Sequence, residues 1–219
     1  MTEIGIPIGT SKIAGDFELP HSPRGVVLFA HGSGSSRFSP RNRQVASALQ
    51  NAGFGTLLMD LLTAEEDRVD RETAEFRFDI SLLATRLAAA TDWLRAQAHT
   101  QALALGYFGA STGAAAALMA AGQRPDDVDA VVSRGGRPDL AGEWLPKVQA
   151  PTLLIVGSRD KLVIDLNRSA MQHIVGEKSI EIVPGATHLF EEPGALEQVA
   201  KRATEWFRHY LLRDRDNAA

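Results

Sequence analysis

Cysteine is absent from the 219 residues of this chain, which excludes disulfide bonds, thiolate metal ligands and a thiol nucleophile. An excess of one charge is also missing, because 23 Lys and Arg stand against 27 Asp and Glu and no basic stripe is present. The net charge of −4 argues against nucleic acid as a partner. No apolar run reaches the roughly 20 residues of a membrane-spanning helix. Residues 1–15 also lack the charged start and apolar block of a secretion signal. These absences predict a cytoplasmic protein with no membrane partner.

Hydrophobic residues make up 44% of the sequence, enough for one core, and we expect a single domain over residues 1–219. Short, continuous apolar runs predict strands covered on both faces, as in a parallel sheet. They lie at residues 25–30, 56–61, 103–108, 130–133, 152–156 and 180–183. Helical periodicity covers residues 80–97 and 195–212, while the first twenty residues resemble an antiparallel edge hairpin. The pattern predicts an α/β fold, a mostly parallel sheet with helices on both faces.

A serine between two glycines follows the third of these runs. Gly109-Ala110-Ser111-Thr112-Gly113 is a G-x-S-x-G pattern between a predicted strand and an alanine-rich helix. At a sharp strand-to-helix turn the serine Oγ projects over the sheet edge. Side chains two residues to either side would collide with the turn, so both positions favour glycine. The alternative is a glycine-rich turn that serves packing alone. Ser111 is therefore a candidate nucleophile, which needs a base and an orienting acid.

An acid and a base follow along the chain. Asp160 lies in the loop after the strand at 152–156, and His188 lies in the loop after the strand at 180–183. The chain order Ser, Asp, His is that of α/β-hydrolases, and parallel strands place all three residues at one edge of the sheet. Each residue has a simpler interpretation, because Asp160 could cap the next helix and His188 could be a hydrogen-bonded loop residue. Their joint order favours a catalytic triad.

A glycine-rich stretch after the first long strand is predicted to complete the catalytic site with an oxyanion-binding loop. His31-Gly32 is followed there by Ser33, whose backbone N–H is predicted to bind the developing oxyanion together with that of Thr112. His31 is interpreted as a structural residue that holds the loop. The competing interpretation is a dinucleotide fingerprint, which needs a third glycine where Arg37 stands and a helix directly after the loop.

The stretches HGSGSSR, GASTGAAAAL, VGSRDKLV and PGATHLFEEPGALEQVA, in this order, resemble the dienelactone hydrolase-like branch of the α/β-hydrolase superfamily over residues 25–213. The resemblance implies an eight-stranded, mostly parallel sheet whose second strand is antiparallel. It also implies a triad of Ser111, Asp160 and His188, and neither a metal nor an organic cofactor. Dienelactone hydrolases carry cysteine as the nucleophile, whereas this chain has Ser111. Specificity for lactone ring opening is therefore not expected, and what remains is hydrolysis at an activated acyl carbon.

The predicted function is that of a serine hydrolase that cleaves small carboxylic esters through an acyl-enzyme. The same residues would serve a thioesterase, a peptidase or an acyltransferase, and a hydrolase scaffold can also be a non-catalytic binding protein. Residues 134–150 are too few for a cap domain. We therefore expect no cap and an open nucleophile.

Two charged features leave alternatives open. Residues 63–79 are dense in charge and follow a strand, so they emerge at the ligand-binding edge of the sheet. The favoured interpretation is a solvated connection, and the alternative is a lid. Several arginines could rim the site and favour an anionic acyl group, although exposed arginines are common. They are Arg37, Arg41, Arg43, Arg134 and Arg137.

Overall fold

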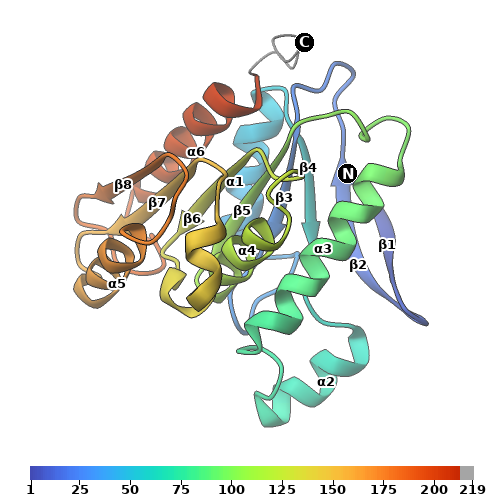
Figure 1. The fold of residues 1–219 in the computed structure, drawn as a ribbon, viewed down its shortest axis with the longest axis horizontal. Coiled ribbons are helices and arrows are strands. Elements are labelled where there is room, and N and C mark those ends of the chain that lie inside the picture. The colour runs from blue at the N-terminus through green and yellow to red at the C-terminus, as the bar shows by residue number, and fades with distance from the viewer. Residues whose placement is uncertain (213–219) are drawn as a thin grey trace.

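A computed structural model describes residues 1–212 (Figure 1), and residues 213–219, the end of the expected domain, lie outside the described part. The strands are β1 (Thr2–Ile8), β2 (Ser11–Glu18), β3 (Val26–Ala30), β4 (Gly55–Met59), β5 (Leu105–Ala110), β6 (Ala130–Arg134), β7 (Thr152–Gly157) and β8 (Lys178–Val183). The helices are α1 (Pro40–Asn51), α2 (Ala64–Thr73), α3 (Ile80–Ala96), α4 (Thr112–Gln123), the 3₁₀ segment η1 (Pro138–Lys147), α5 (Lys161–Met171) and α6 (Ala195–Leu211). The strands and helices predicted from the sequence are all present.

The strands form one eight-stranded sheet in the order β1-β2-β4-β3-β5-β6-β7-β8. β2 runs antiparallel to both of its neighbours, and every other neighbouring pair is parallel. This topology confirms the predicted fold. The register pairs Ala30 of β3 with Gly109 of β5, and Ala110 of β5 with Arg134 of β6. The loops that follow these three strands therefore leave the sheet side by side at its carboxyl edge.

Helices cover both faces of the sheet (Figure 1). α1 and α6 lie on one face, where the core includes Val27, Phe29 and Phe108. α3 and α4 lie on the other face, where the core includes Leu28 and Tyr107. Successive residues of a strand point to opposite faces. Central strands buried on both sides therefore need continuous apolar runs, which is the pattern seen in the sequence.

The helix after the G-x-S-x-G pattern is almost wholly buried. Residues 114–117, all alanine, have no exposed surface, and their small side chains let α4 lie close against β5, α3 and η1. Packing this dense leaves little room for movement. The N-terminus of α4 is therefore held firmly at the centre of the carboxyl edge.

β1 and β2 form the edge hairpin predicted for the N-terminal residues. Gly9 makes the turn with a φ of 55°, which glycine adopts without strain. Ile6 and Ile13 pair across the two strands and are buried, whereas most other residues of β1 are exposed. Burial on one side only is typical of antiparallel strands and gives the sheet a partly solvated edge.

Residues 63–79 contain helix α2, so the favoured interpretation as a solvated connection is incomplete. Thr63 and Glu66 form a capping box, in which the Thr63 N–H donates to the Glu66 carboxylate at 2.8 Å and the Glu66 N–H donates to the Thr63 hydroxyl at 3.2 Å. The one buried residue of α2 is Asp70, whose carboxylate accepts the N–H groups of Phe76 and Arg77. Polar contacts rather than apolar packing hold this helix, which projects from the body of the molecule in Figure 1.

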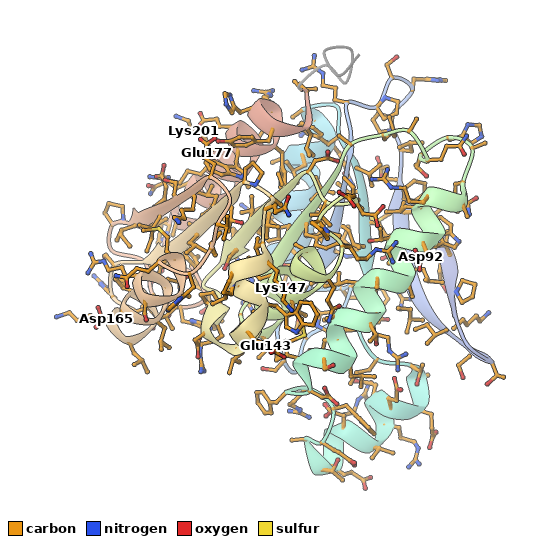
Figure 2. All side chains as sticks on the ribbon, in the orientation of Figure 1. Asp92, Glu143, Lys147, Asp165, Glu177 and Lys201 are labelled. Carbon is orange, nitrogen blue, oxygen red and sulfur yellow. The ribbon has the colours of Figure 1, made fainter. Side chains whose placement is uncertain are left out.

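The connection from β6 to β7 contains only η1 over residues 135–151, so no cap domain is inserted at this point of the described chain. Among residues 1–212 no helix is both long and apolar enough to cross a membrane. Charged side chains of both signs are spread over the surface, as the balanced composition requires. Figure 2 labels Asp92, Glu143, Lys147, Asp165, Glu177 and Lys201.

Candidate active site

Ser111 lies at the turn between β5 and α4, where it is the N-cap residue of the helix. Its φ of 52° and ψ of −121° are a positive-φ conformation that strains any residue with a side chain. The Ser111 hydroxyl does not cap the helix. The Ser111 N–H donates to the carbonyl of Arg134 at 3.2 Å, and the Arg137 N–H donates to the carbonyl of Ser111 at 3.2 Å. These two bonds tie the strained turn to the last residue of β6 and to the loop that follows it.

Both glycines of the G-x-S-x-G pattern are required by sterics. A Cβ atom at Gly109 would overlap the backbone of the first turn of α4, and one at Gly113 would overlap the carbonyl groups of Ala30 and His31. Backbone atoms of buried strands and helices cannot move aside. The crowding predicted on either side of Ser111 is therefore confirmed.

Asp160 and His188 form a hydrogen-bonded pair. Nδ1 of His188 lies 2.6 Å from Oδ2 of Asp160, so in the neutral ring Nδ1–H donates to the carboxylate and Nε2 is left as a proton acceptor. Asp160 directly precedes α5, but its side chain makes no capping bond to that helix. The simpler interpretation of Asp160 as a helix cap is therefore wrong. The carboxylate is 17% exposed and the imidazole 40% exposed, so solvent can reach the ring.

The end of β6 and the residues that follow it contact both Ser111 and His188. Arg134 and Arg137 hydrogen-bond to the Ser111 backbone, and a Cβ atom at Gly135 would lie 3.1 Å from the His188 carbonyl oxygen. Gly135 has a φ of 51°, which turns the chain between these contacts. Ser111 and the Asp160–His188 pair therefore lie beside one short segment at the carboxyl edge of the sheet.

His31 holds the glycine-rich loop after β3. Its Nδ1 lies 2.9 Å from the carbonyl oxygen of Gly32, and its Nε2 accepts the Leu61 N–H at 3.1 Å. Burial lowers the pKa of His31, which favours a neutral ring with its proton on Nδ1. The ring thus fixes the loop to the residues that follow β4.

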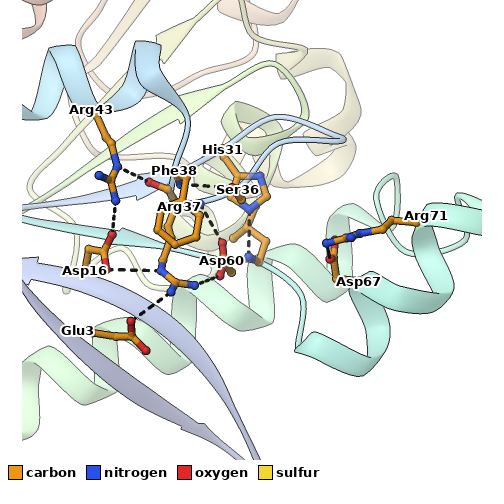
Figure 3. A network of polar contacts seen from close by, with 11 residues as sticks. Glu3, Asp16, His31, Ser36, Arg37, Phe38, Arg43, Asp60, Asp67 and Arg71 are labelled. Atoms are coloured by element: carbon orange, nitrogen blue, oxygen red, sulfur yellow. Dashed lines mark hydrogen bonds and ion pairs between the residues drawn. The ribbon is translucent and has the colours of Figure 1, made fainter.

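A second anchor of this loop is an ion-pair network that the sequence did not reveal (Figure 3). The Arg37 N–H and guanidinium both donate to Asp60, at 2.8 and 2.5 Å. Arg37 also lies 3.4 Å from Asp16 and 3.4 Å from Glu3, and Arg43 lies 2.6 Å from Asp16. The Arg37 side chain is 12% exposed, so water screens these pairs only partly. The network joins the loop to β1, β2 and the end of β4.

The two predicted oxyanion donors contact each other. The Ser33 N–H donates to Oγ1 of Thr112 at 2.9 Å, and a Cβ atom at Gly32 would lie 3.1 Å from Cβ of Ser111. The loop after β3 therefore lies beside the Ser111 turn. The Thr112 hydroxyl accepts the Ser33 N–H, a contact that the sequence pattern does not reveal.

A cavity of about 980 Å³ opens beside this loop and reaches Gly32, Ser33 and Thr112. Its size is at the upper end of the range for small-molecule sites. The walls come from the β1–β2 hairpin, the loop after β3 and α2; they include Lys12, Ile13, Arg37, Phe38, Leu62, Asp67 and Arg71. Figure 3 shows Asp67 and Arg71 of α2 in this region. Residues 63–79 therefore form part of a cavity wall.

The five arginines that the sequence suggested at the rim of the site differ in their ion-pair partners. Four of them pair with carboxylates, in the pairs Arg37–Asp60, Arg41–Glu191, Arg43–Asp16 and Arg137–Asp139. Arg134 is buried and has no carboxylate partner among residues 1–212. The sequence offers no signal that separates Arg134 from the others.

Two arrangements that could hold a cofactor are not found in the described part of the chain. No group of three or more His, Asp or Glu side chains is placed there to hold a metal ion. The loop after β3 does not enter a helix directly, since α1 begins at Pro40. The position that requires the third glycine of a dinucleotide fingerprint holds Arg37, bound to Asp60. The dinucleotide interpretation therefore lacks both of its structural requirements.

The sheet topology, the strained serine turn and the Asp–His pair together define the α/β-hydrolase class. The family described as "Dienelactone hydrolase family" matches residues 13–211, and the chain belongs to this family. A crystal structure of dienelactone hydrolase from Anabaena variabilis is 58% identical, with a TM-score of 0.94 over 96% of this chain and 97% of that one. Est1E from Butyrivibrio proteoclasticus is 15% identical and shares the fold, with a TM-score of 0.78 over 94% of this chain and 98% of that one. The family membership supports a hydrolase.

Two curated relatives from Mycobacterium tuberculosis carry the name "Putative phosphoribosyl transferase" and are 58% identical over 209 residues. The match covers 95% of this chain but 46% of each relative, so the chain spans about half of their length. The other half of each relative lies outside the match. Their name therefore does not assign an activity to the half that matches this chain.

Proposed function

We propose that this chain is a serine esterase that hydrolyses carboxylic esters of small molecules. The observation that carries the proposal is the Ser111 turn, with its φ of 52°, at the same sheet edge as the 2.6 Å Asp160–His188 pair. A strained turn is retained where the chemistry needs the exposed hydroxyl. Membership of a hydrolase family supports the same class of reaction.

The reaction passes through an acyl-enzyme. Ser111 Oγ attacks the acyl carbon while Nε2 of His188 accepts the hydroxyl proton. Asp160 keeps Nδ1–H directed at its carboxylate and stabilises the imidazolium. His188 then donates the proton to the departing alkoxide, which leaves as the alcohol. Water attacks the acyl-enzyme with His188 again as the base, and collapse releases the acid and restores the serine.

The negative oxygen of each tetrahedral intermediate is bound by the backbone N–H groups of Ser33 and Thr112. Thr112 is the first residue of α4, so the positive end of the helix adds to the stabilisation. One donor of this kind lowers the barrier by about 3–4 kcal/mol. The Ser33 N–H must leave the Thr112 hydroxyl before it can bind the substrate oxygen.

The cavity beside Ser33 receives one arm of the substrate in this proposal. The charged residues on its walls balance, with Lys12, Arg37, Arg71 and Arg77 against Glu3, Asp60, Asp67 and Asp70. A wall with balanced charge favours a polar but uncharged group over an anion. The phosphoribosyl transferase name of the longer relatives finds no support in Ser111 or the Asp160–His188 pair, which suit acyl transfer.

The test combines active-site labelling with turnover. A fluorophosphonate should label the wild-type protein at Ser111, and Ser111→Ala should lose both labelling and p-nitrophenyl butyrate hydrolysis by about 10³-fold or more. Ser169→Ala changes an exposed serine on α5 and is the matched control. Labelling or turnover of Ser111→Ala near the wild-type value would contradict the proposal. A panel with one acyl group as oxygen ester, thioester and amide then identifies the bond that is cleaved fastest.

A further inference from the structure

Arg134 is a buried cation without a counterion. Its side chain lies at the end of β6 and the residue is 8% exposed, yet Nε and Nη1 have no hydrogen-bond partner among residues 1–212. Nη2 lies 3.5 Å from Oδ1 of Asn42, which is at the limit of a hydrogen bond. Burial, and then the charge of Arg41, lowers the pKa of Arg134 to about 10, so the guanidinium remains charged at neutral pH. A buried charge of this kind is unfavourable unless a partner compensates it.

Arg41 brings a second guanidinium near enough for its charge to act on Arg134. Its Nη1 donates to Glu191 at 2.9 Å, and its Nε is buried without a partner in the described chain. The Glu191 side chain is 62% exposed, so water screens its charge. Two guanidinium groups therefore face one weakly effective carboxylate. The excess positive charge of Arg134 and Arg41 would be compensated by a bound anion.

The N-terminus of α1 adds to this positive field. Arg41 and Asn42 are the second and third residues of the helix, which begins at Pro40 after the N-cap Ser39. The start of a twelve-residue helix carries a partial positive charge that favours anions. The contact with Asn42 shows that the Arg134 guanidinium is directed at this first turn.

We infer that Arg134, Arg41 and the first turn of α1 form a binding site for a small oxyanion, a carboxylate or a phosphate group. A planar guanidinium matches the oxygen geometry of both groups. The Arg134 carbonyl accepts the Ser111 N–H at 3.2 Å, so the site adjoins the nucleophile turn. The oxyanion is either a free ion or a group carried by the substrate, and only the second source rests on the proposed esterase function.

The binding test measures thermal unfolding with and without inorganic phosphate, with the ionic strength held constant by sodium chloride. Phosphate at ten times its Kd should raise the Tm of the wild-type protein by about 3–6 °C. Arg134→Met should reduce this shift to below about 1 °C, because methionine fills the same volume without a donor. Arg168→Met, an exposed arginine on α5, should retain the full shift.

Two further variants keep the test decisive. Arg134→Met should fold, since it replaces an uncompensated buried charge with an apolar side chain; if it does not, Arg41→Met supplies the same test at a more exposed position. Ser111→Ala should retain the phosphate shift, which separates this site from any failure of the esterase proposal. No shift in the wild-type protein, or equal shifts in wild type, Arg134→Met and Arg168→Met, would overturn the inference.

Kinetics identify the source of the oxyanion. The values of kcat/KM are compared for p-nitrophenyl butyrate and mono-p-nitrophenyl succinate, which differ mainly in a terminal carboxylate. A preference for the succinate ester that falls by about 10-fold in Arg134→Met assigns the anion to the substrate. Equal ratios in both proteins, together with the phosphate shift, assign it to a free ion.

Discussion

Replacement of Thr112 by valine tests how the proposed oxyanion site is arranged before substrate binds. In the free protein the Ser33 N–H donates to Oγ1 of Thr112 at 2.9 Å, and Thr112 is 4% exposed. Valine has nearly the same shape as threonine but offers no acceptor. The Ser33 N–H of the variant therefore has no partner until the substrate arrives.

The lost hydrogen bond stabilises the wild-type fold by about 0.5–1.5 kcal/mol, which corresponds to a decrease in Tm of about 1–6 °C for a chain of this size. In the proposed mechanism the wild-type protein must break this bond on the way to the transition state, whereas the variant need not. The same free energy predicts an increase in kcat/KM of about 2–13-fold. Stability and activity should therefore change in opposite directions.

The assay measures Tm and kcat/KM for p-nitrophenyl butyrate on one preparation of each protein. Thr112→Ser keeps the hydroxyl, so its Tm and its kcat/KM should both stay close to the wild-type values. A decrease of kcat/KM in Thr112→Val would refute the reasoning, because the hydroxyl would then be a donor to the oxyanion and not a competitor for the Ser33 N–H.

Three other perturbations test the residues that hold the Ser111 turn and the loop after β3 in place. Gly113→Ala should lower the free energy of unfolding by about 3 kcal/mol, because its Cβ overlaps the carbonyls of Ala30 and His31, and urea unfolding measures this. Burial lowers the pKa of His31 below 6.5, so the unfolded chain binds more protons than the folded one and stability falls as the pH drops below 6.5. Between pH 7.5 and 5.5 protonation of His31 in the unfolded chain should lower the free energy of unfolding by up to about 1.4 kcal/mol. In His31→Gln, urea unfolding at the two pH values should show a decrease that is smaller by this amount. Arg37→Met should cost about 3 kcal/mol, because the shielded Asp60 carboxylate loses its ion-pair partner while Asp16 keeps Arg43. Arg71→Met, in an exposed pair, should cost below about 1 kcal/mol.

The Ser111 turn could be predicted from the sequence because its constraints are local. Gly109 and Gly113 are required by clashes with chain segments that any strand–turn–helix unit brings close. Asp160 and His188 follow successive parallel strands, and the topology alone brings such loops to one edge. Their hydrogen bond needed no information beyond the order of strands and the residue types in the loops.

The ion pairs could not be predicted, because an arginine in a sequence does not show which carboxylate it will meet. Arg37 pairs with carboxylates on β1, on β2 and after β4, and Arg134 has no carboxylate partner among residues 1–212. α2 was missed for a different reason. Its single buried residue is Asp70, so no apolar periodicity marks the helix, although the capping box of Thr63 and Glu66 is readable in the sequence.

Different forces thus position the two sides of the site. Steric exclusion at the glycines and the packed alanines of α4 fix the Ser111 turn, and neither depends on pH or salt. The loop of Ser33 and helix α2 are held mainly by hydrogen-bonded charges, including the pairs of Arg37 with Asp60 and of Arg86 with Glu66, both at 2.5 Å. Partly exposed charge pairs are weakened by salt and by protonation of their carboxylates. Ser111 is therefore the rigid reference of the proposed site, and the cavity wall beside it is the part whose geometry solution conditions can change.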